Sequence, residues 1–548
     1  MQKVQIKASV VNLQVDRAVI RRYKYFNSVV YSPNVSGPRQ PKIFTVIAKA
    51  KYLKALETYD PFVKRSSNYL YLFKRISKYI SNWSSFFLDN RNLLYSKRIF
   101  KSLKNLSGMK SSSVNPAMLR YLPHLRVLKL ISFSHQVTPK QAGVISRNSY
   151  LRRLKSLGVD SRSFDQCMAW MFHLDQNKDF VSHLEDLYLS WGSMMRVFPG
   201  DWELWNKLKS ISIFFNAYSN AMEEIPVNLS KIKSIQALGF TFASCHLYQK
   251  ELKNILSVLR NLEWLAVLNL YIDFAKLNDE ESKSIADLIR VPQNLTVFRL
   301  HTNDQKISNI ISKGLLASLN VDKIKSLSLQ FENLNEFKNE ETFQIQQVFE
   351  NMRYLEDLCI ILYAQQSETE IDMTPFVQSF YKLSDLKILY FETDNNITNS
   401  GLHAGPPLEK LETLQIRSAQ NKNRKRISVE DIYGLINPKC ITDINITHVE
   451  PLGEEEIINK FALISKMTTL ITLSIRLHAT SGITETIVSA LGGMIANLKY
   501  IKNITVRISG ELDFIGNDEL DKLKNILKYQ LKFLNLYNIE LSNMRISS

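Results

Sequence analysis

The chain has 548 residues, of which 45% are hydrophobic, and a formal net charge of +18. This length allows several domains or one long repeat array, and the hydrophobic content excludes wholesale disorder. No apolar stretch approaches the roughly 18 to 20 residues that a helix needs to cross a bilayer. The four cysteines are far apart in the sequence, which excludes a dense disulfide framework and predicts a reducing, intracellular setting.

The excess positive charge lies in the first fifth of the chain. Residues 1–118 contain 22 Lys and Arg against 4 Asp and Glu, whereas the other 430 residues hold 48 of each sign. A stretch rich in serine, residues 111–116, ends this basic part. The charge asymmetry therefore predicts two parts with different roles, residues 1–118 and residues 119–548.

Residues 1–118 are expected to be mainly helical. Apolar residues at helical spacing predict one helix over residues 67–88, with Lys74, Arg75 and Lys78 elsewhere on its surface, and a second over residues 94–106. Such helices would cover the open core at the start of a repeat array. Alternatively, the basic residues interleaved with aromatic ones could bind nucleic acid or an anionic membrane surface.

From residue 119 onward, one short pattern recurs: an apolar residue, two others, an apolar residue, one other, and an apolar residue. Its last apolar positions run from Leu130 to Leu536 in fourteen steps that average 29 residues. Clear copies are Leu125-Leu128-Leu130, Leu184-Leu187-Leu189, Leu265-Leu268-Leu270, Leu355-Leu358-Ile360 and Leu470-Leu473-Ile475, and there are fifteen copies in all.

Each copy predicts a short strand followed by a helix. The end of the pattern alternates with period two, as a strand with one buried face does. The intervening residues have helical spacing, most clearly over residues 279–290 and after Glu454. Neither element can bury its apolar face alone, so stacked copies predict an α/β solenoid with parallel strands inside and helices outside.

These registered copies resemble the leucine-rich repeat family, specifically the long-repeat subclass typified by ribonuclease inhibitor. The resemblance covers residues 119–548. It implies a horseshoe of about 15 strand-helix units with the parallel strands on its concave face. It also implies that the concave face binds a protein partner.

The strand positions on either side of the last apolar residue should face the concave surface. They place an aromatic cluster on the early repeats and arginines on the late ones, and such side chains are frequent anchors of protein interfaces. The candidate partner-binding residues are Tyr188, Trp191, Phe214, Phe215, Tyr271, Arg299, His301, Tyr390, Arg417, Arg476, Arg507 and Tyr537.

The sequence lacks the motifs of an enzyme. It contains neither a phosphate-binding loop of the G-x-x-x-x-G-K-[ST] type nor an H-E-x-x-H zinc motif. Cys359 is predicted on the concave face, but Asp357 nearby would raise the pKa of its thiol and so disfavour a reactive thiolate. We therefore expect no catalytic, metal-binding or cofactor-binding residues.

The leading hypothesis is an intracellular scaffold, cytoplasmic or nuclear, that binds a protein through the concave face. In one alternative, the N-terminal segment resembles an F-box-like module and the chain is a substrate adaptor of a ubiquitin ligase. In another, the chain is nucleic-acid-associated through residues 1–118. The near absence of acidic residues from residues 1–56 also leaves a mitochondrial transit sequence as an alternative.

Overall fold

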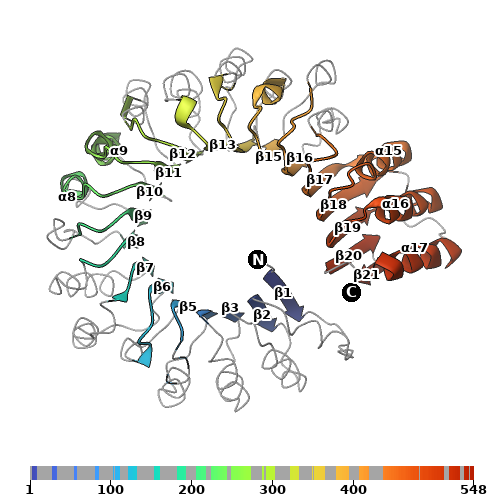
Figure 1. The fold of residues 1–548 in the computed structure, drawn as a ribbon, viewed down its shortest axis with the longest axis horizontal. Helices are drawn as coiled ribbons and strands as arrows, with labels where there is room; N and C mark the ends of the chain where they lie inside the picture. Colours follow the sequence, from blue (N-terminus) through green and yellow to red (C-terminus); the bar gives the residue numbers. More distant parts are fainter. Residues whose placement is uncertain are drawn as a thin grey trace. The chain divides into compact units, whose positions relative to one another are not determined.

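The computed structural model describes the strands of the chain, the turns that precede them and several helices (Figure 1). The described residues are 3–8, 28–33, 55–58, 81–85, 101, 103, 105–111, 121–131, 153–160, 182–192, 205–216, 224–242, 249–272, 287–288, 292–302, 321–331, 349, 351–363, 378–393, 406–418, 436–480, 482–510, 517–530, 536–541 and 544–547. They form two compact units, unit 1 over Met1–Leu265 and unit 2 over Ala266–Ser548.

Unit 1 contains a ladder of parallel strands that pair in chain order. Each strand from β1 to β9 pairs with the next one along the chain. The strands are β1 (Lys3–Ala8), β2 (Ser28–Pro33), β3 (Ala55–Thr58), β4 (Asn82–Ser85), β5 (Gly108–Ser111), β6 (Val127–Ile131), β7 (Ser156–Asp160), β8 (Asp186–Gly192), β9 (Ser210–Asn216) and β10 (Ala237–Phe242).

This ladder begins within the N-terminal segment, which was expected to be mainly helical. The described residues of this segment include β1 to β5, and β5 pairs directly with β6 on the other side of residue 118. Lys101, within the helix expected over residues 94–106, is helical, and most of that helix lies outside the described residues. The helix predicted over residues 67–88 is wrong at Asn82–Ser85, which form β4. Lys74, Arg75 and Lys78 lie outside the described residues.

Unit 2 contains a second ladder built in the same way. Its strands pair in parallel from β11 to β20, and the last strand, β21, turns back to pair with β20 in the antiparallel direction. The strands are β11 (Val267–Ile272), β12 (Val297–Thr302), β13 (Ser326–Phe331), β14 (Asp357–Leu362), β15 (Ile388–Thr393), β16 (Thr413–Ser418), β17 (Asp443–Leu452), β18 (Thr472–Ala479), β19 (Asn503–Ser509), β20 (Leu536–Leu541) and β21 (Met544–Ser547).

The core of each unit is a stack of apolar rows contributed by successive turns. In β11, β12, β13 and β14, every second residue is buried, as the alternation in the sequence predicts. A buried leucine or isoleucine precedes many of the strands, for example Leu265, Leu295 and Ile324. Each repeat thus buries its apolar residues against its neighbours, which is the organisation of an α/β solenoid.

The turns before the strands are joined by a repeated hydrogen-bond pattern. The carbonyl oxygen of Lys155 accepts hydrogen bonds from the backbone N–H groups of both Glu185 and Asp186, at 2.7 and 2.9 Å. In unit 2, the carbonyl of Lys325 accepts from Glu356 and Asp357 in the same way. One carbonyl with two lone pairs therefore satisfies two donors of the following repeat.

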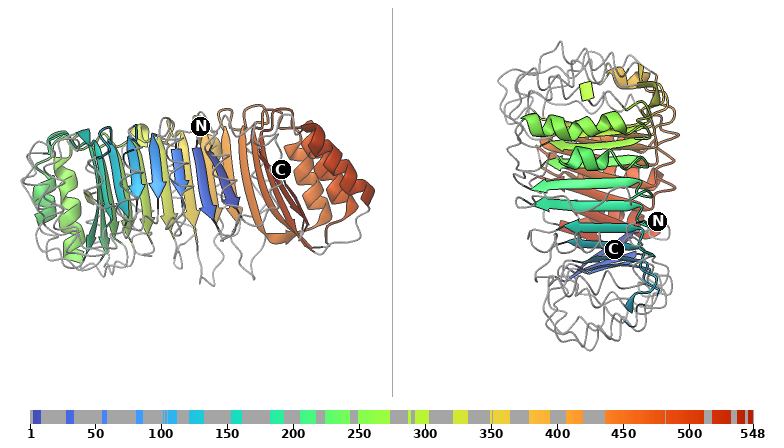
Figure 2. Two further views of the ribbon diagram at one scale, coloured as in Figure 1. Left: turned by 90° about the horizontal axis from the view of Figure 1, so that it is seen from below. Right: turned by 90° about the vertical axis from the view of Figure 1, so that its left-hand side faces the viewer.

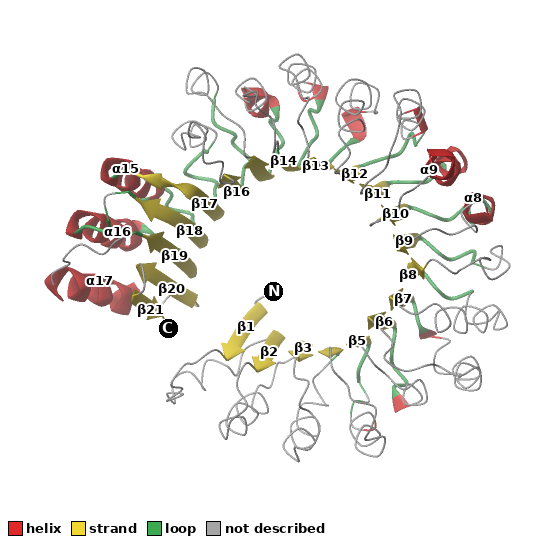
Figure 3. Cartoon of the chain, turned by 180° about the vertical axis from the view of Figure 1, so that it is seen from behind, coloured by secondary structure: helices red, strands yellow, loops and turns green. Residues whose placement is uncertain are grey.

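The described helices lie on the outer side of the strands (Figure 3). Unit 1 has α8 (Glu224–Leu229), α9 (Gln249–Leu256) and the 3-10 helix η6 (Ser257–Asn261); unit 2 has α15 (Glu454–Ile464), α16 (Glu485–Asn497), α17 (Asn517–Gln530) and the 3-10 helices η9 (Val321–Lys323) and η10 (Phe380–Lys382). Figure 2 shows α15, α16 and α17 side by side along the sheet of unit 2.

The helix expected after Glu454 is confirmed, because α15 buries Ile457, Phe461 and Ile464. Most of the helix expected over residues 279–290 lies outside the described residues.

Candidate functional site

The face of each sheet that points away from the helices, here called the open face, carries two rows of side chains. In unit 2 the strand register aligns the second row from Tyr271 through His301, Gln330, Ile361, Glu392, Arg417, Thr447, Arg476 and Arg507 to Glu540. The prediction of this row from the sequence is confirmed from Tyr271 to Arg507.

The row differs from the prediction at its last member. Tyr537 lies opposite Ile504, which belongs to a buried row, and Glu540 lies opposite Arg507. Among the side chains of β20 that the structure describes, Ile539 and Leu541 are buried. The register therefore places Tyr537 in the row of Ile504 and not in the row of Arg507, and the Tyr537 side chain is not among those described.

The aromatic residues predicted on the early repeats are divided between the two units. Tyr188 and Phe214 lie on the open face of unit 1, where the Tyr188 side chain is 37% exposed. Phe215 is fully buried, with its ring stacked on Phe242 at 4.8 Å, so its assignment to the surface is wrong. The backbone of Trp191 pairs with that of Phe215, and the Trp191 side chain is not among those described.

Tyr271 begins the open face of unit 2. Its ring centroid lies 4.1 Å from that of His301 on the next strand. Arg299, two residues before His301, is exposed on the neighbouring row. These three predicted residues therefore lie close together at one end of the unit 2 sheet.

A nearly buried carboxylate forms the centre of the candidate site. The side chain of Glu392 in β15 is only 2% exposed, although it belongs to the open-face row. The hydroxyl groups of Tyr363 and Tyr390 both donate hydrogen bonds to it. The Nε atom of Arg417, on the next strand, lies 3.2 Å from Oε1 of Glu392. The carboxylate thus satisfies three donors and fixes the orientation of Arg417.

The two tyrosines differ from ordinary tyrosines in acidity. Burial, followed by hydrogen bonding to Glu392, raises the pKa of Tyr390 to about 12. The same causes raise the pKa of Tyr363 well above its usual range. Both hydroxyls therefore stay protonated and continue to donate to Glu392 at neutral pH.

We expect the ionisation of Tyr390 to be visible in an alkaline titration. The unfolded chain ionises Tyr390 near pH 10, whereas the folded chain retains its proton up to about pH 12. The contribution of this group to stability is complete below pH 10 and is lost as the pH rises through this window. Phenolate absorbance should show that Tyr390→Phe removes amplitude near pH 12, and that Glu392→Gln lowers the pKa of Tyr390. Loss of amplitude near pH 10 in Tyr390→Phe would contradict this arrangement.

A shallow hollow of about 490 Å³ lies beside Glu392 on the open face. The side chains of Tyr390, Arg417, Arg476 and Arg507 contribute to its walls. Nε and Nη2 of Arg507 lie 2.8 and 2.7 Å from Oε2 of Glu540, so this arginine is held in place as Arg417 is. Arg476 is exposed between them and has no ion-pair partner within the described part of the chain.

The sequence identified the arginines but missed the groups that orient them. Glu392 occupies a predicted open-face position, and its place between Tyr390 and Arg417 is the signal that could have identified it. Tyr363 follows the end of β14 and carries no repeat signal. Glu540 was missed because β20 begins later than the apolar pattern indicates.

The remaining chemistry of the described residues is sparse. Burial is the main cause that raises the pKa of the Cys359 thiol, and Asp357 adds to it, so the direction expected from the sequence is confirmed. Among the described residues, no cluster of His, Cys, Asp or Glu could hold a metal ion. None of the described helices combines the length and apolar character needed to span a membrane.

No protein-family model matches the chain, and no curated protein shows significant similarity to it.

Proposed function

We propose that the chain is a non-enzymatic interaction protein that binds a protein partner through the open face of unit 2. Arg417, Arg476 and Arg507 would receive acidic side chains of the partner. The observation that carries the proposal is the row of three arginines around one hollow, two of them oriented by Glu392 and Glu540. A preorganised guanidinium loses little freedom when it binds a carboxylate, which favours affinity.

The more specific fold assignment is also a proposal. We propose that the chain is a divergent leucine-rich repeat protein of the long-repeat subclass, with an array that acts inside the cell. The parallel pairing of β1 to β6 supports a start of this array before residue 119. No observation favours the ubiquitin-ligase adaptor over a plain scaffold, because the described residues of the N-terminal segment continue the strand ladder.

Arg476→Glu tests the proposed interface directly. We expect this variant to retain the stability of the wild type and to capture the partner roughly tenfold less well. The new glutamate would repel the partner's carboxylate, and this like-charge repulsion costs on the order of 1 to 2 kcal/mol or more. The measurement is quantitative mass spectrometry of proteins purified with the full chain, followed by a binding constant for the reconstituted pair.

The matched control is Arg353→Glu, which reverses an exposed arginine on a turn of the same unit. If both variants lost partner capture equally, the change in net charge alone would explain the loss, and the proposal would be contradicted. A complex that resists Arg476→Glu but is lost in the double variant Tyr188→Ala and Phe214→Ala would instead assign binding to unit 1.

A further inference from the structure

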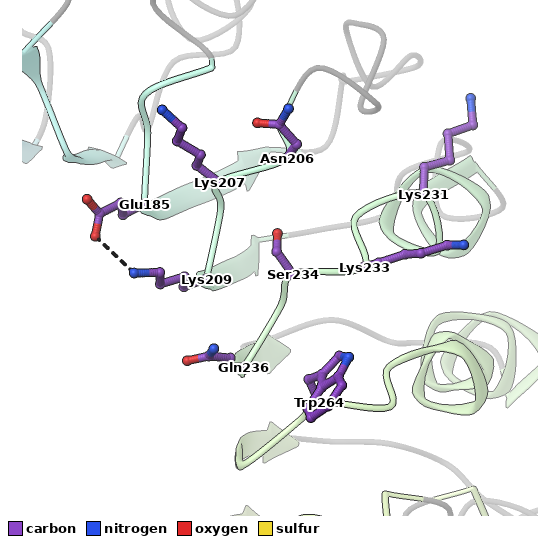
Figure 4. Close-up of a pocket in the computed structure, with 9 residues that line it drawn as sticks. All are labelled: Glu185, Asn206, Lys207, Lys209, Lys231, Lys233, Ser234, Gln236 and Trp264. Atoms are coloured by element: carbon purple, nitrogen blue, oxygen red, sulfur yellow. Dashed lines mark hydrogen bonds and ion pairs between the residues drawn. The ribbon is translucent and has the colours of Figure 1, made fainter.

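A second charged surface lies at one edge of the sheet of unit 1, where the chain enters β9 and β10. Figure 4 shows a hollow at this edge with lysine side chains around it. The hollow has a volume of about 740 Å³ and is open to solvent. Its cationic groups are Lys207, Lys209, Lys231 and Lys233.

The described residues compensate only part of the positive charge of this hollow. Glu185 is the acidic residue among those that line it. Nζ of Lys209 lies 3.5 Å from Oε2 of Glu185, and Lys155 pairs with the other oxygen of the same carboxylate. Lys207, Lys231 and Lys233 have no acidic partner among the residues that the structure describes. With respect to the described residues, these three exposed ammonium groups are the candidates for contact with a ligand.

The repeat itself places these groups at the surface. In the turn before each strand, buried residues such as Leu208 and Ile235 alternate with residues that point outward. Trp264 lies between the buried Leu262 and Leu265, so its indole is forced outward and is 65% exposed. In Figure 4 this ring lies on the side of the hollow next to Gln236. Tyr354 and Tyr500 are also exposed at this repeat position, and the feature particular to Trp264 is the group of lysines that lines the same hollow.

The composition of the hollow favours phosphate over a protein ligand. Lysine is depleted in protein interfaces, where arginine is enriched, whereas lysine commonly neutralises the phosphates of nucleic acids. An exposed aromatic ring beside a basic groove provides a platform on which a base can stack. The open form suits an extended chain that passes across it better than a small molecule, which a site normally encloses.

We propose that this hollow, with Trp264 and the lysines on two successive turns, binds single-stranded nucleic acid. The lysines neutralise phosphates, and one unpaired base stacks on the indole of Trp264. This surface is separate from the arginine row proposed to bind a protein, and it lies outside the basic residues 1–118.

The test uses the full chain and a fluorescently labelled oligouridine of about 12 nucleotides, within the usual range of site sizes. Trp264→Ala should weaken binding roughly tenfold, as the loss of one stacked base does. The triple variant Lys207→Gln, Lys231→Gln and Lys233→Gln should weaken binding and reduce the slope of log K against log salt by about 2.

Matched controls come from unit 2. Tyr500 is 66% exposed and occupies the same repeat position as Trp264, and Tyr500→Ala should leave binding unchanged. The triple variant Lys382→Gln, Lys466→Gln and Lys502→Gln removes equal charge from exposed positions before the strands of unit 2 and should also have little effect. Equal losses in these controls would overturn the proposal.

Photocrosslinking distinguishes binding of the oligonucleotide at this hollow from binding at the basic residues 1–118, because it identifies the peptides that contact the oligonucleotide. With 4-thiouridine in the oligonucleotide, the crosslinked peptides should include the one that contains Trp264. Crosslinks confined to residues 1–118 would overturn the proposal. Equally effective displacement of the oligonucleotide by polyglutamate would also overturn it, because it would identify an acidic protein segment as the ligand. Equally effective displacement by uridine monophosphate would exclude an extended chain.

Discussion

Replacement of Phe215 by alanine is expected to destabilise unit 1 by about 3 to 5 kcal/mol. Phe215 is fully buried, its ring stacks on Phe242 with an interplanar angle of 4°, and it also contacts Phe240 at 6.0 Å. Truncation would remove both ring contacts and leave a cavity that the close-packed rows cannot fill by small shifts. The measurement is denaturant-induced unfolding followed by circular dichroism.

The neighbouring residue provides the control. Phe214 is partly exposed on the open face, so Phe214→Ala should cost about 1 kcal/mol or less. The pair tests which face of β9 each phenylalanine occupies. If the two variants were equally destabilised, the assignment of Phe215 to the core and Phe214 to the surface would be incorrect.

The second large effect is expected from Glu392→Ala. This substitution removes the common acceptor of Tyr363, Tyr390 and Arg417 and should destabilise unit 2 by about 2 to 4 kcal/mol. The exposed part of Arg417 can be hydrated in the variant, which keeps the loss below that of a fully buried pair. Arg417 would also lose its fixed orientation, so binding of an acidic partner should weaken as well.

Two further variants separate charge from hydrogen bonding. Glu392→Gln retains an accepting oxygen and should cost roughly half as much as Glu392→Ala. Glu540→Ala removes a more exposed carboxylate from Arg507 and should cost about 1 kcal/mol or less. Chemical denaturation of all three chains provides the comparison, and equal losses for Glu392→Ala and Glu540→Ala would contradict the special position of Glu392.

The rows of buried and open-face residues in unit 2 were predictable, because successive side chains of a strand point to opposite faces and one face is buried. From Leu268 to Val506 the apolar pattern identifies both the buried and the open-face positions. The prediction failed at β20 because α17 extends to Gln530, so the strand starts only at Leu536. The sequence contains two overlapping apolar alternations there, and the strand uses the later one, in which Ile539 and Leu541 are buried.

The N-terminal strands keep only part of the repeat pattern: Leu106 and Met109 match Leu125 and Leu128, but Ser111 replaces the last apolar residue. β3, β4 and β5 have four residues each, and their sequences ALET, NWSS and GMKS lack the apolar alternation. They are strands because each pairs with a neighbour in register, such as Trp83 with Met109. The helical stripe through Trp83 is therefore coincidental at that position.

Phe215 shows a different failure. The buried residues Ile211 and Ile213 continue to Phe215 with the same period, so the sequence contained the information that Phe215 is in the core. The adjacent aromatic residues Phe214 and Phe215 were instead predicted together on the surface. Successive side chains of β9 point to opposite faces of the sheet, so Phe214 and Phe215 lie on different faces.

The shared carbonyls of the turns have a consequence for synthesis of the chain on the ribosome. In each pair the acceptor lies upstream and the two donors lie about one repeat downstream, as for Lys155 with Glu185 and Asp186. A nascent chain can therefore complete a turn only after the next repeat has left the exit tunnel. Cotranslational folding would then advance in one direction and remain one repeat behind translation.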